Sequence, residues 1–182
     1  MHLLHLTIIF SVHIDLRFVI FFLFLVQLTN SLFAQKSLNA IRIDKQIKVD
    51  GILDEAYWSV ADKATDFIQR SPEPGGLPSQ RTEVAILYND AYLYIGAWLY
   101  DDRPDGILTE LTSRDQGGNS DRFSVFFDTY NDDLNAYEFS VSAAGVQSDA
   151  RISPGSFDRN WDVGWYSDVS ITDEGWFVEI EI

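Results

Sequence analysis

Apolar and polar residues alternate with a period of two along most of the chain after residue 39. Such alternation puts successive side chains on opposite faces of a strand, so it predicts β-structure rather than helix. Asn89 and Asp90 predict a two-residue turn between two of the strands. Short strands separated by turn residues predict an all-β fold, namely a two-sheet antiparallel β-sandwich of jelly-roll or immunoglobulin-like type. The predicted strands are 40–43, 47–49, 81–88, 91–100, 122–129, 136–143, 146–152 and 176–182.

Two segments depart from this alternation. Residues 54–61 (DEAYWSVA) predict one short helix with Asp54 as its N-cap. Residues 71–79 contain three prolines and two glycines, which predict a loop. Within 91–100 the alternation gives one aliphatic face and one aromatic face, and the aromatic face is either core or a binding platform.

The first 34 residues have the pattern of a secretory signal peptide. Arg17 precedes an apolar stretch, residues 18–33, and the small residue Ala34 follows it. We therefore expect cleavage near Ala34 and export of residues 35–182 to the periplasm, the cell surface or the medium. An uncleaved membrane anchor is the alternative, but polar residues interrupt the stretch before the roughly 20 apolar residues that a span requires.

We expect residues 35–182 to form one domain without a membrane span. The last predicted strand stops in mid-alternation at Glu181–Ile182. We therefore expect the polypeptide to continue into a C-terminal domain.

Composition narrows the chemistry that the exported part can perform. The chain has no cysteine, and its three histidines (His2, His5 and His13) all lie in the leader. This excludes Ser-His-Asp and Cys-His catalysis, and zinc sites built on histidine or cysteine. The net charge of −15 disfavours nucleic acid as a partner. It suits neutral ligands and hard cations such as calcium, which take oxygen ligands.

Five side chains are candidates for ligand binding. Trp161 and Trp165 lie in a polar segment, 156–168, where large rings either cover the core or contact a ligand. Trp98 belongs to the aromatic strand face described above, and Asn160 precedes Trp161. Arg114 either donates a fork of hydrogen bonds to sugar hydroxyls or forms a surface salt bridge.

Several stretches of sequence resemble family 9 carbohydrate-binding modules. The opening of those modules is similar to residues 47–61 (IKVDGILDEAYWSVA), and their central hairpin is similar to residues 87–102 (LYNDAYLYIGAWLYDD). The likeness continues through 121–132, 136–150 and 161–182. The variant present here resembles the module at the N-terminus of large exported Gram-negative bacterial proteins of unknown function.

The resemblance implies a β-sandwich, sugar binding between two tryptophan rings, and bound calcium. By position, Asn160 and Trp161 match one side of that clamp, whereas Trp165 and Trp98 are both candidates for the second ring. Asp101, Asp102 and Asp128 are candidate calcium ligands, with Asp132, Asp133 and Asp149 nearby in sequence. Solvated turn residues are the alternative for all of these acids.

Three functions are consistent with these patterns. The first is non-catalytic binding of a polysaccharide or oligosaccharide, in a protein that acts in polysaccharide breakdown. The second is a structural or interaction scaffold of a larger outer-membrane protein, with no sugar site. The third is a glycoside hydrolase whose catalytic acids would lie beyond residue 182, because no acid of this segment sits in a motif that raises its pKa.

Overall fold

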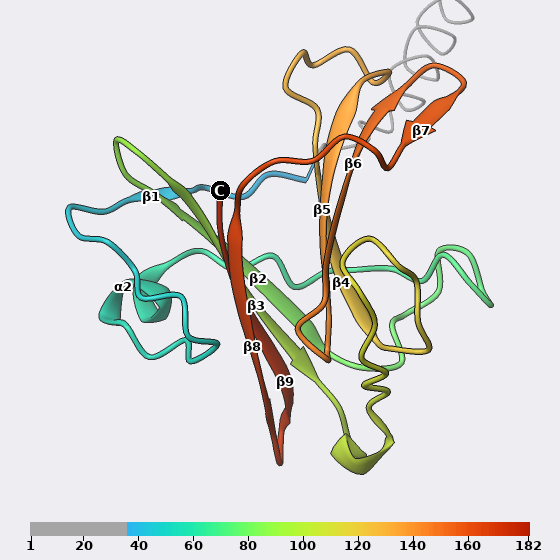
Figure 1. Cartoon of the computed structure of the whole chain (residues 1–182). Helices are drawn as coiled ribbons and strands as arrows, with labels where there is room; N and C mark the ends of the chain where they lie inside the picture. The colour runs from blue at the N-terminus through green and yellow to red at the C-terminus, as the bar shows by residue number, and fades with distance from the viewer. Residues whose placement is uncertain (1–35) are drawn as a thin grey trace, which may run out of the picture. The chain divides into compact units, whose positions relative to one another are not determined.

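The computed structural model describes residues 36–182, so the predicted signal peptide lies outside the described residues. Residues Leu38–Ile182 form one compact unit that contains two facing sheets (Figure 1). A five-stranded sheet has the order β1-β2-β3-β9-β8, and a four-stranded sheet has the order β4-β5-β6-β7. All neighbouring strands are antiparallel except β1 and β2. The predicted β-sandwich is confirmed.

The strands of the five-stranded sheet are β1 (Ile41–Arg42), β2 (Thr82–Tyr88), β3 (Leu93–Tyr100), β8 (Tyr166–Thr172) and β9 (Gly175–Glu181). Those of the four-stranded sheet are β4 (Arg122–Phe127), β5 (Ala136–Ser142), β6 (Gln147–Ser153) and β7 (Ser156–Asp158). The described helices are α2 (Ala56–Val60) and the 3-10 turn η1 (Pro104–Gly106). Strands β7 and β8 were missing from the sequence prediction, because serine and aspartate interrupt the apolar alternation in both. The strand predicted at 47–49 does not form.

The first hydrophobic core lies between the two sheets. Its buried residues come from alternate positions of β3 and β9 on one side and of β5 on the other. Two tryptophans, Trp165 and Trp176, complete it. The remaining members are Ile95, Ala97, Ile107, Phe139, Val141, Ala143, Val178 and Ile180.

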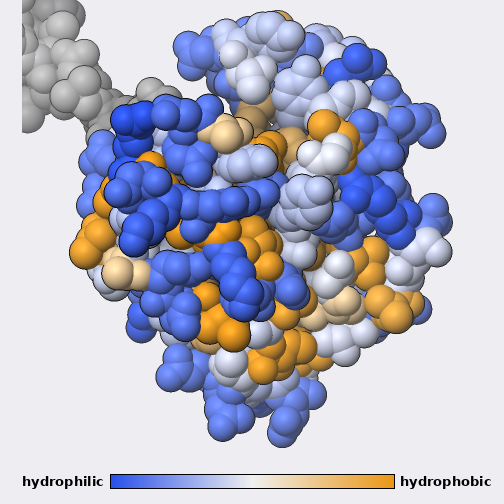
Figure 2. All heavy atoms as spheres, turned by 60° about the vertical axis from the view of Figure 1, so that its left-hand side comes forward, coloured by the Kyte–Doolittle hydropathy of each residue, from blue (hydrophilic) through white to orange (hydrophobic). Residues whose placement is uncertain are grey.

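A second core lies on the other face of the five-stranded sheet, beneath α2. Trp58 of α2 packs there with Tyr94 of β3, and both are fully buried. Gly96 of β3 makes room for them: a Cβ at this position would lie 2.7 Å from Leu53 Cδ2 and 2.9 Å from Trp58 Cζ3. The face of the molecule that Figure 2 shows mixes hydrophilic side chains with apolar patches.

The carboxylate of Glu179 organises this second core. Its side chain points from β9 to the α2 side and is 1% exposed. The N–H groups of Asp50 and Gly51 both donate to Glu179 Oε2 at 2.9 Å, and Trp58 Nε1 donates to Oε1 at 3.2 Å. Burial raises the pKa of Glu179 to about 7, because desolvation outweighs these three donors. One acid therefore holds the Asp50–Gly51 turn and the helix against the sheet.

Two local predictions need correction. The helix begins at Ala56 with Glu55, not Asp54, at its N-cap, and no side chain caps it. The Glu55 carboxylate instead accepts hydrogen bonds from Lys48 N and Trp58 Nε1. The hairpin turn is displaced by one residue from the predicted position. Asn89 N donates to Tyr92 O at 3.0 Å, which places Asp90 and Ala91 at the tip of the turn.

The buried carboxylate predicts a specific pH dependence of stability. Between pH 4.5 and about 7 the native state holds a proton on Glu179 that the unfolded chain has released, so the free energy of unfolding falls as the pH rises through this window. The full decrease is roughly 3 kcal/mol and is complete above pH 7. Urea unfolding at pH 5 and pH 8 should show this decrease in the wild type and a smaller one in Glu179→Gln. Equal pH dependence in the two proteins would contradict a raised pKa at this position.

Candidate functional site

The segment between β7 and β8 carries Trp161 and Trp165 over one end of the core between the sheets. Trp165 is 4% exposed, and its ring centroid lies 5.5 Å from that of Phe139. Trp161 is half-buried, with its ring 4.8 Å from Tyr137 and 6.1 Å from Phe139. The two indoles therefore pack onto the same core residue, and they do not form an open pair of facing rings.

The other two clamp candidates lie elsewhere. Asn160 is exposed, and its N–H and Nδ2 groups both donate to Asp158 Oδ1. Trp98 belongs to the α2 side of the five-stranded sheet, where it meets Trp58 edge-on at 6.2 Å between ring centroids. Lys63 Nζ covers the Trp98 ring at 3.8 Å from its centroid. The fold thus places Trp98 and Trp161 on opposite sides of the five-stranded sheet.

Arg114 is the centre of a polar network that holds the loop before β8. Its Nη2 contacts Asp149 Oδ1 at 2.7 Å, and its Nη1 donates to Gln147 Oε1 at 2.6 Å. Asp149 has no exposed side-chain surface and also accepts a hydrogen bond from Val163 N at 3.0 Å. Arg114 contacts Asp162 as well, at 3.1 Å. Its guanidinium is therefore largely engaged by the protein, which favours a structural role.

The candidate calcium ligands fold into turn-capping roles. Asp128 accepts hydrogen bonds from the N–H groups of Tyr130, Asp132 and Asp133. Asp101 Oδ1 accepts from Arg103 N at 2.6 Å, and Asp102 is exposed. Within residues 36–182 no three histidine, cysteine, aspartate or glutamate side chains gather into a group that could hold a metal ion. Bound calcium at Asp101, Asp102 or Asp128 stays a prediction, and the function proposed below does not depend on it.

A different surface has the features of a binding site: the face of the four-stranded sheet that points away from the core. Strand register aligns Ser124 of β4, Ser140 of β5 and Ser148 of β6 in one row across this face. Ser124 Oγ donates to Ser140 Oγ at 2.8 Å. These small side chains form a low floor on the outer face of the sheet. Ser140 and Ala150 point away from the core, yet both are buried.

Walls on both sides turn this floor into a hollow of about 410 Å³, which we call the outer-face trough. One wall is the loop that follows Arg114, and the other carries Arg159. The lining residues are Asp115, Gln116, Gly117, Gly118, Arg122, Glu138, Ser140, Ser148 and Arg159. Two exposed phenylalanine rings flank the trough. Phe126 of β4 is paired in strand register with Glu138 of β5, and Phe157 of β7 lies beneath Arg159, whose Cζ is 4.8 Å from the ring centroid.

The trough was not predicted from the sequence, although one signal was present. Ser140 and Ser142 alternate with Phe139 and Val141, so their face of β5 was visibly polar and small. The alignment of Ser124 and Ser148 with Ser140 depends on strand register, which the alternation of one strand does not reveal.

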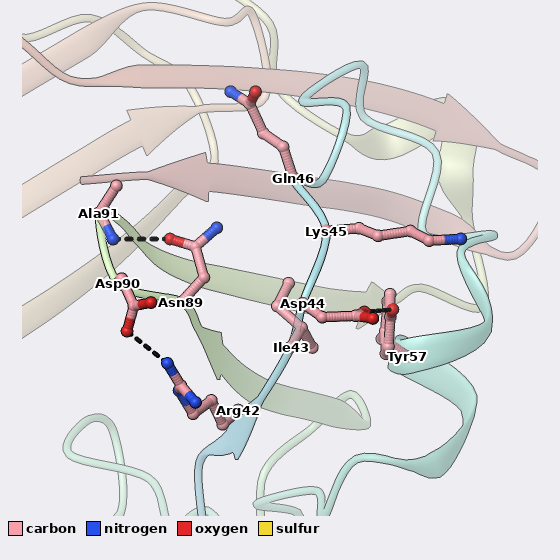
Figure 3. A pocket seen from close by; sticks show the side chains of 9 residues that line it. All are labelled: Arg42, Ile43, Asp44, Lys45, Gln46, Tyr57, Asn89, Asp90 and Ala91. Carbon is pink, nitrogen blue, oxygen red and sulfur yellow. Dashed lines mark hydrogen bonds and ion pairs between the residues drawn. The ribbon is translucent and has the colours of Figure 1, made fainter.

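A second hollow, of about 580 Å³, lies beside β1 and the turn at residues 89–91 (Figure 3). Its polar groups are directed at one another: Arg42 pairs with Asp90, and the Tyr57 hydroxyl donates to Asp44. Asn89 Oδ1 accepts from Ala91 N at 2.9 Å. These side chains bond to one another at the edge of the sheet, and none of the predicted site residues lines this hollow.

Comparison with known proteins supports the fold. No family model and no curated protein matches the sequence. Two solved structures of a family 9 carbohydrate-binding module from Caldicellulosiruptor kristjanssonii are similar to the chain, one in complex with cellotriose and one with glucose. They are 16% and 17% identical, and each has a TM-score of 0.54. The alignments cover 79% of this chain and 67% and 68% of those chains. The fold is thus like that of family 9 modules. No helix among residues 36–182 is long and apolar enough to cross a membrane.

The Arg114 network predicts a stability effect that is independent of any ligand. Arg114→Ala would leave the buried Asp149 carboxylate without its cation, which should lower the free energy of unfolding by about 3 kcal/mol. Arg151→Ala is the matched control, since Arg151 pairs with the partly exposed Asp158 and should cost less than about 1 kcal/mol. Urea unfolding at pH 7 measures both, and equal losses would show that Arg114 is only a surface ion pair.

Proposed function

We propose that residues 35–182 act as an exported, non-catalytic carbohydrate-binding module, and that the sugar lies in the outer-face trough. The observation that carries this proposal is the combination of a small-residue floor with polar walls on one face of a sandwich. The Ser148 hydroxyl and the two guanidinium groups of the trough can donate to sugar hydroxyls, and the Glu138 carboxylate can accept from them. The family 9-like fold, seen elsewhere in complex with cellotriose and glucose, supports the same function.

The flanking rings supply the apolar part of sugar recognition. Phe126 is 54% exposed and Phe157 is 45% exposed, and both lie on the trough side of the four-stranded sheet. An apolar sugar face can pack on such a ring while its hydroxyl edge points to the polar floor. A shallow site of this kind binds modestly, because ordering the ligand offsets much of the contact energy.

The wider setting belongs to the same proposal. The leader favours export to the periplasm, the cell surface or the medium. A sugar-binding module of this kind would serve a protein that acts in polysaccharide breakdown by holding it on its glycan.

A structural scaffold is the second candidate. The resemblance to family 9 modules gives three tryptophans as clamp candidates, namely Trp98, Trp161 and Trp165. Each of these rings packs against another side chain of the protein. If the trough holds no sugar, the fold serves only to connect other parts of a larger outer-membrane protein.

Removal of Glu138 tests the trough. Glu138→Ala should lower the affinity for cellotriose, the sugar bound in one of the similar structures, by about tenfold. The reason is that a carboxylate acceptor is worth roughly 1.5–3 kcal/mol. Asp132→Ala, an exposed acid of the neighbouring β4–β5 turn, is the control and should leave the affinity unchanged. Isothermal titration calorimetry measures both. Unchanged affinity in Glu138→Ala would move the sugar site out of the trough, and no glycan binding by the wild type would favour the scaffold.

Trp161 separates the trough from the predicted clamp. Because its ring packs on Tyr137 and Phe139, Trp161→Ala should lower the free energy of unfolding by about 2 kcal/mol. Its affinity for cellotriose at a temperature where the variant stays folded should equal that of the wild type. A variant that keeps its stability and loses cellotriose would instead place the ligand on the Trp161 ring.

A further inference from the structure

Four of the eight arginines among residues 36–182 form an ion pair with a carboxylate. Arg42, Arg81, Arg114 and Arg151 each have an acidic oxygen within 4.0 Å. Such pairing is expected in a chain whose net charge is −15, since acids are abundant near every base. Of the four arginines without an ion pair among these residues, Arg70 and Arg103 lie in loops, whereas Arg122 and Arg159 line the same hollow.

Two unpaired arginines line the outer-face trough. Among residues 36–182, neither Arg122 nor Arg159 has a carboxylate oxygen within the 4.0 Å limit of an ion pair, although Glu138 lines the same hollow. Arg122 Nη1 donates to Ser148 Oγ at 3.2 Å, and Arg159 lies over the Phe157 ring. Each guanidinium is thus positioned by a neutral neighbour, and its positive charge is available to a ligand.

The remaining charge in the trough fits a sugar. Glu138 is half-buried and has no hydrogen bond or ion pair with the described residues, so its oxygens are available to hydroxyl donors. The other acid, Asp115, is engaged by Arg114 Nε at 3.7 Å and by Asp149 N at 3.2 Å. Two available cations and one available anion leave the trough suited to a polyhydroxylated ligand that places one negative charge inside it.

A planar carboxylate matches that charge and geometry. A guanidinium binds a carboxylate through two parallel N–H···O bonds, a geometry that a sugar hydroxyl cannot supply. A phosphate monoester brings nearly two negative charges, and Glu138 would repel the second.

We infer that the outer-face trough recognises an acidic sugar, a hexuronic acid residue of a polysaccharide, with its carboxylate held by Arg122 or Arg159 and its hydroxyls by Glu138. This inference rests on the proposed carbohydrate-binding function and deepens it by naming the class of glycan.

The test compares two trisaccharides that differ only at C6. Cellotriose and the β-1,4-linked trimer of glucuronic acid share backbone and linkage, and calorimetry with the purified protein at low salt measures both affinities. The glucuronate trimer should bind about tenfold more tightly, because hydrogen bonds to a charged group are worth roughly 1.5–3 kcal/mol. Raising the salt concentration should weaken its binding and leave that of cellotriose unchanged, since salt screens charges.

Three variants assign the effect to the arginines. Arg122→Gln and Arg159→Gln should each reduce the preference for the glucuronate trimer, and together they should abolish it without changing the thermal midpoint. Arg151→Gln, whose arginine lies on the other face of the same sheet, is the matched control and should keep the preference.

The outcomes separate the two proposals. Cellotriose binding that equals or exceeds glucuronate binding would overturn the acidic-sugar inference and leave the carbohydrate function intact. Tighter binding of a sulfated cellotriose than of the glucuronate trimer would overturn the choice of a carboxylate. Binding of none of the three sugars would overturn both proposals.

Discussion

A buried carboxylate holds the N-terminal third of this domain to its sheet. Glu179 projects from β9, the strand whose other face contributes Trp176, Val178 and Ile180 to the core between the sheets. Its oxygens accept hydrogen bonds from Asp50, Gly51 and Trp58, and so fix both the turn before α2 and the helix itself. Burying this acid is costly, but without it the N–H donors of the turn and the indole would lose their acceptor.

This arrangement gives the two sheets different surfaces. The five-stranded sheet is covered on both faces, by the four-stranded sheet on one and by α2 and the segment before it on the other. The four-stranded sheet is covered by core on one face, while the other carries serine, alanine and charged side chains. Among the residues that the structure describes, the outer face of the four-stranded sheet is therefore open to a ligand along its strands. The loop after Arg114 and the segment around Arg159 give that face its depth.

The aromatic residues illustrate why residue type alone is a poor guide to a sugar site. Trp161 and Trp165 lie in a polar segment, yet their rings complete the end of the core beside Phe139. Phe126 and Phe157 lie in strands, where apolar side chains usually face a core, yet both are exposed beside the outer-face trough. A ring is available to a ligand only if no neighbour covers it, and that depends on strand direction and on which loops cross it.

The sequence by itself determined the fold class, the positions of most strands, and the absence of histidine and cysteine from residues 35–182. These follow from local alternation and from composition, which need no knowledge of distant neighbours. Only the tertiary structure decided that Glu179 is buried, that Arg114 is engaged by Asp149, and that three serines from three strands form one floor. Each of these depends on contacts between residues far apart in the chain, and strand register, rather than the order of residues within one strand, sets which of them meet.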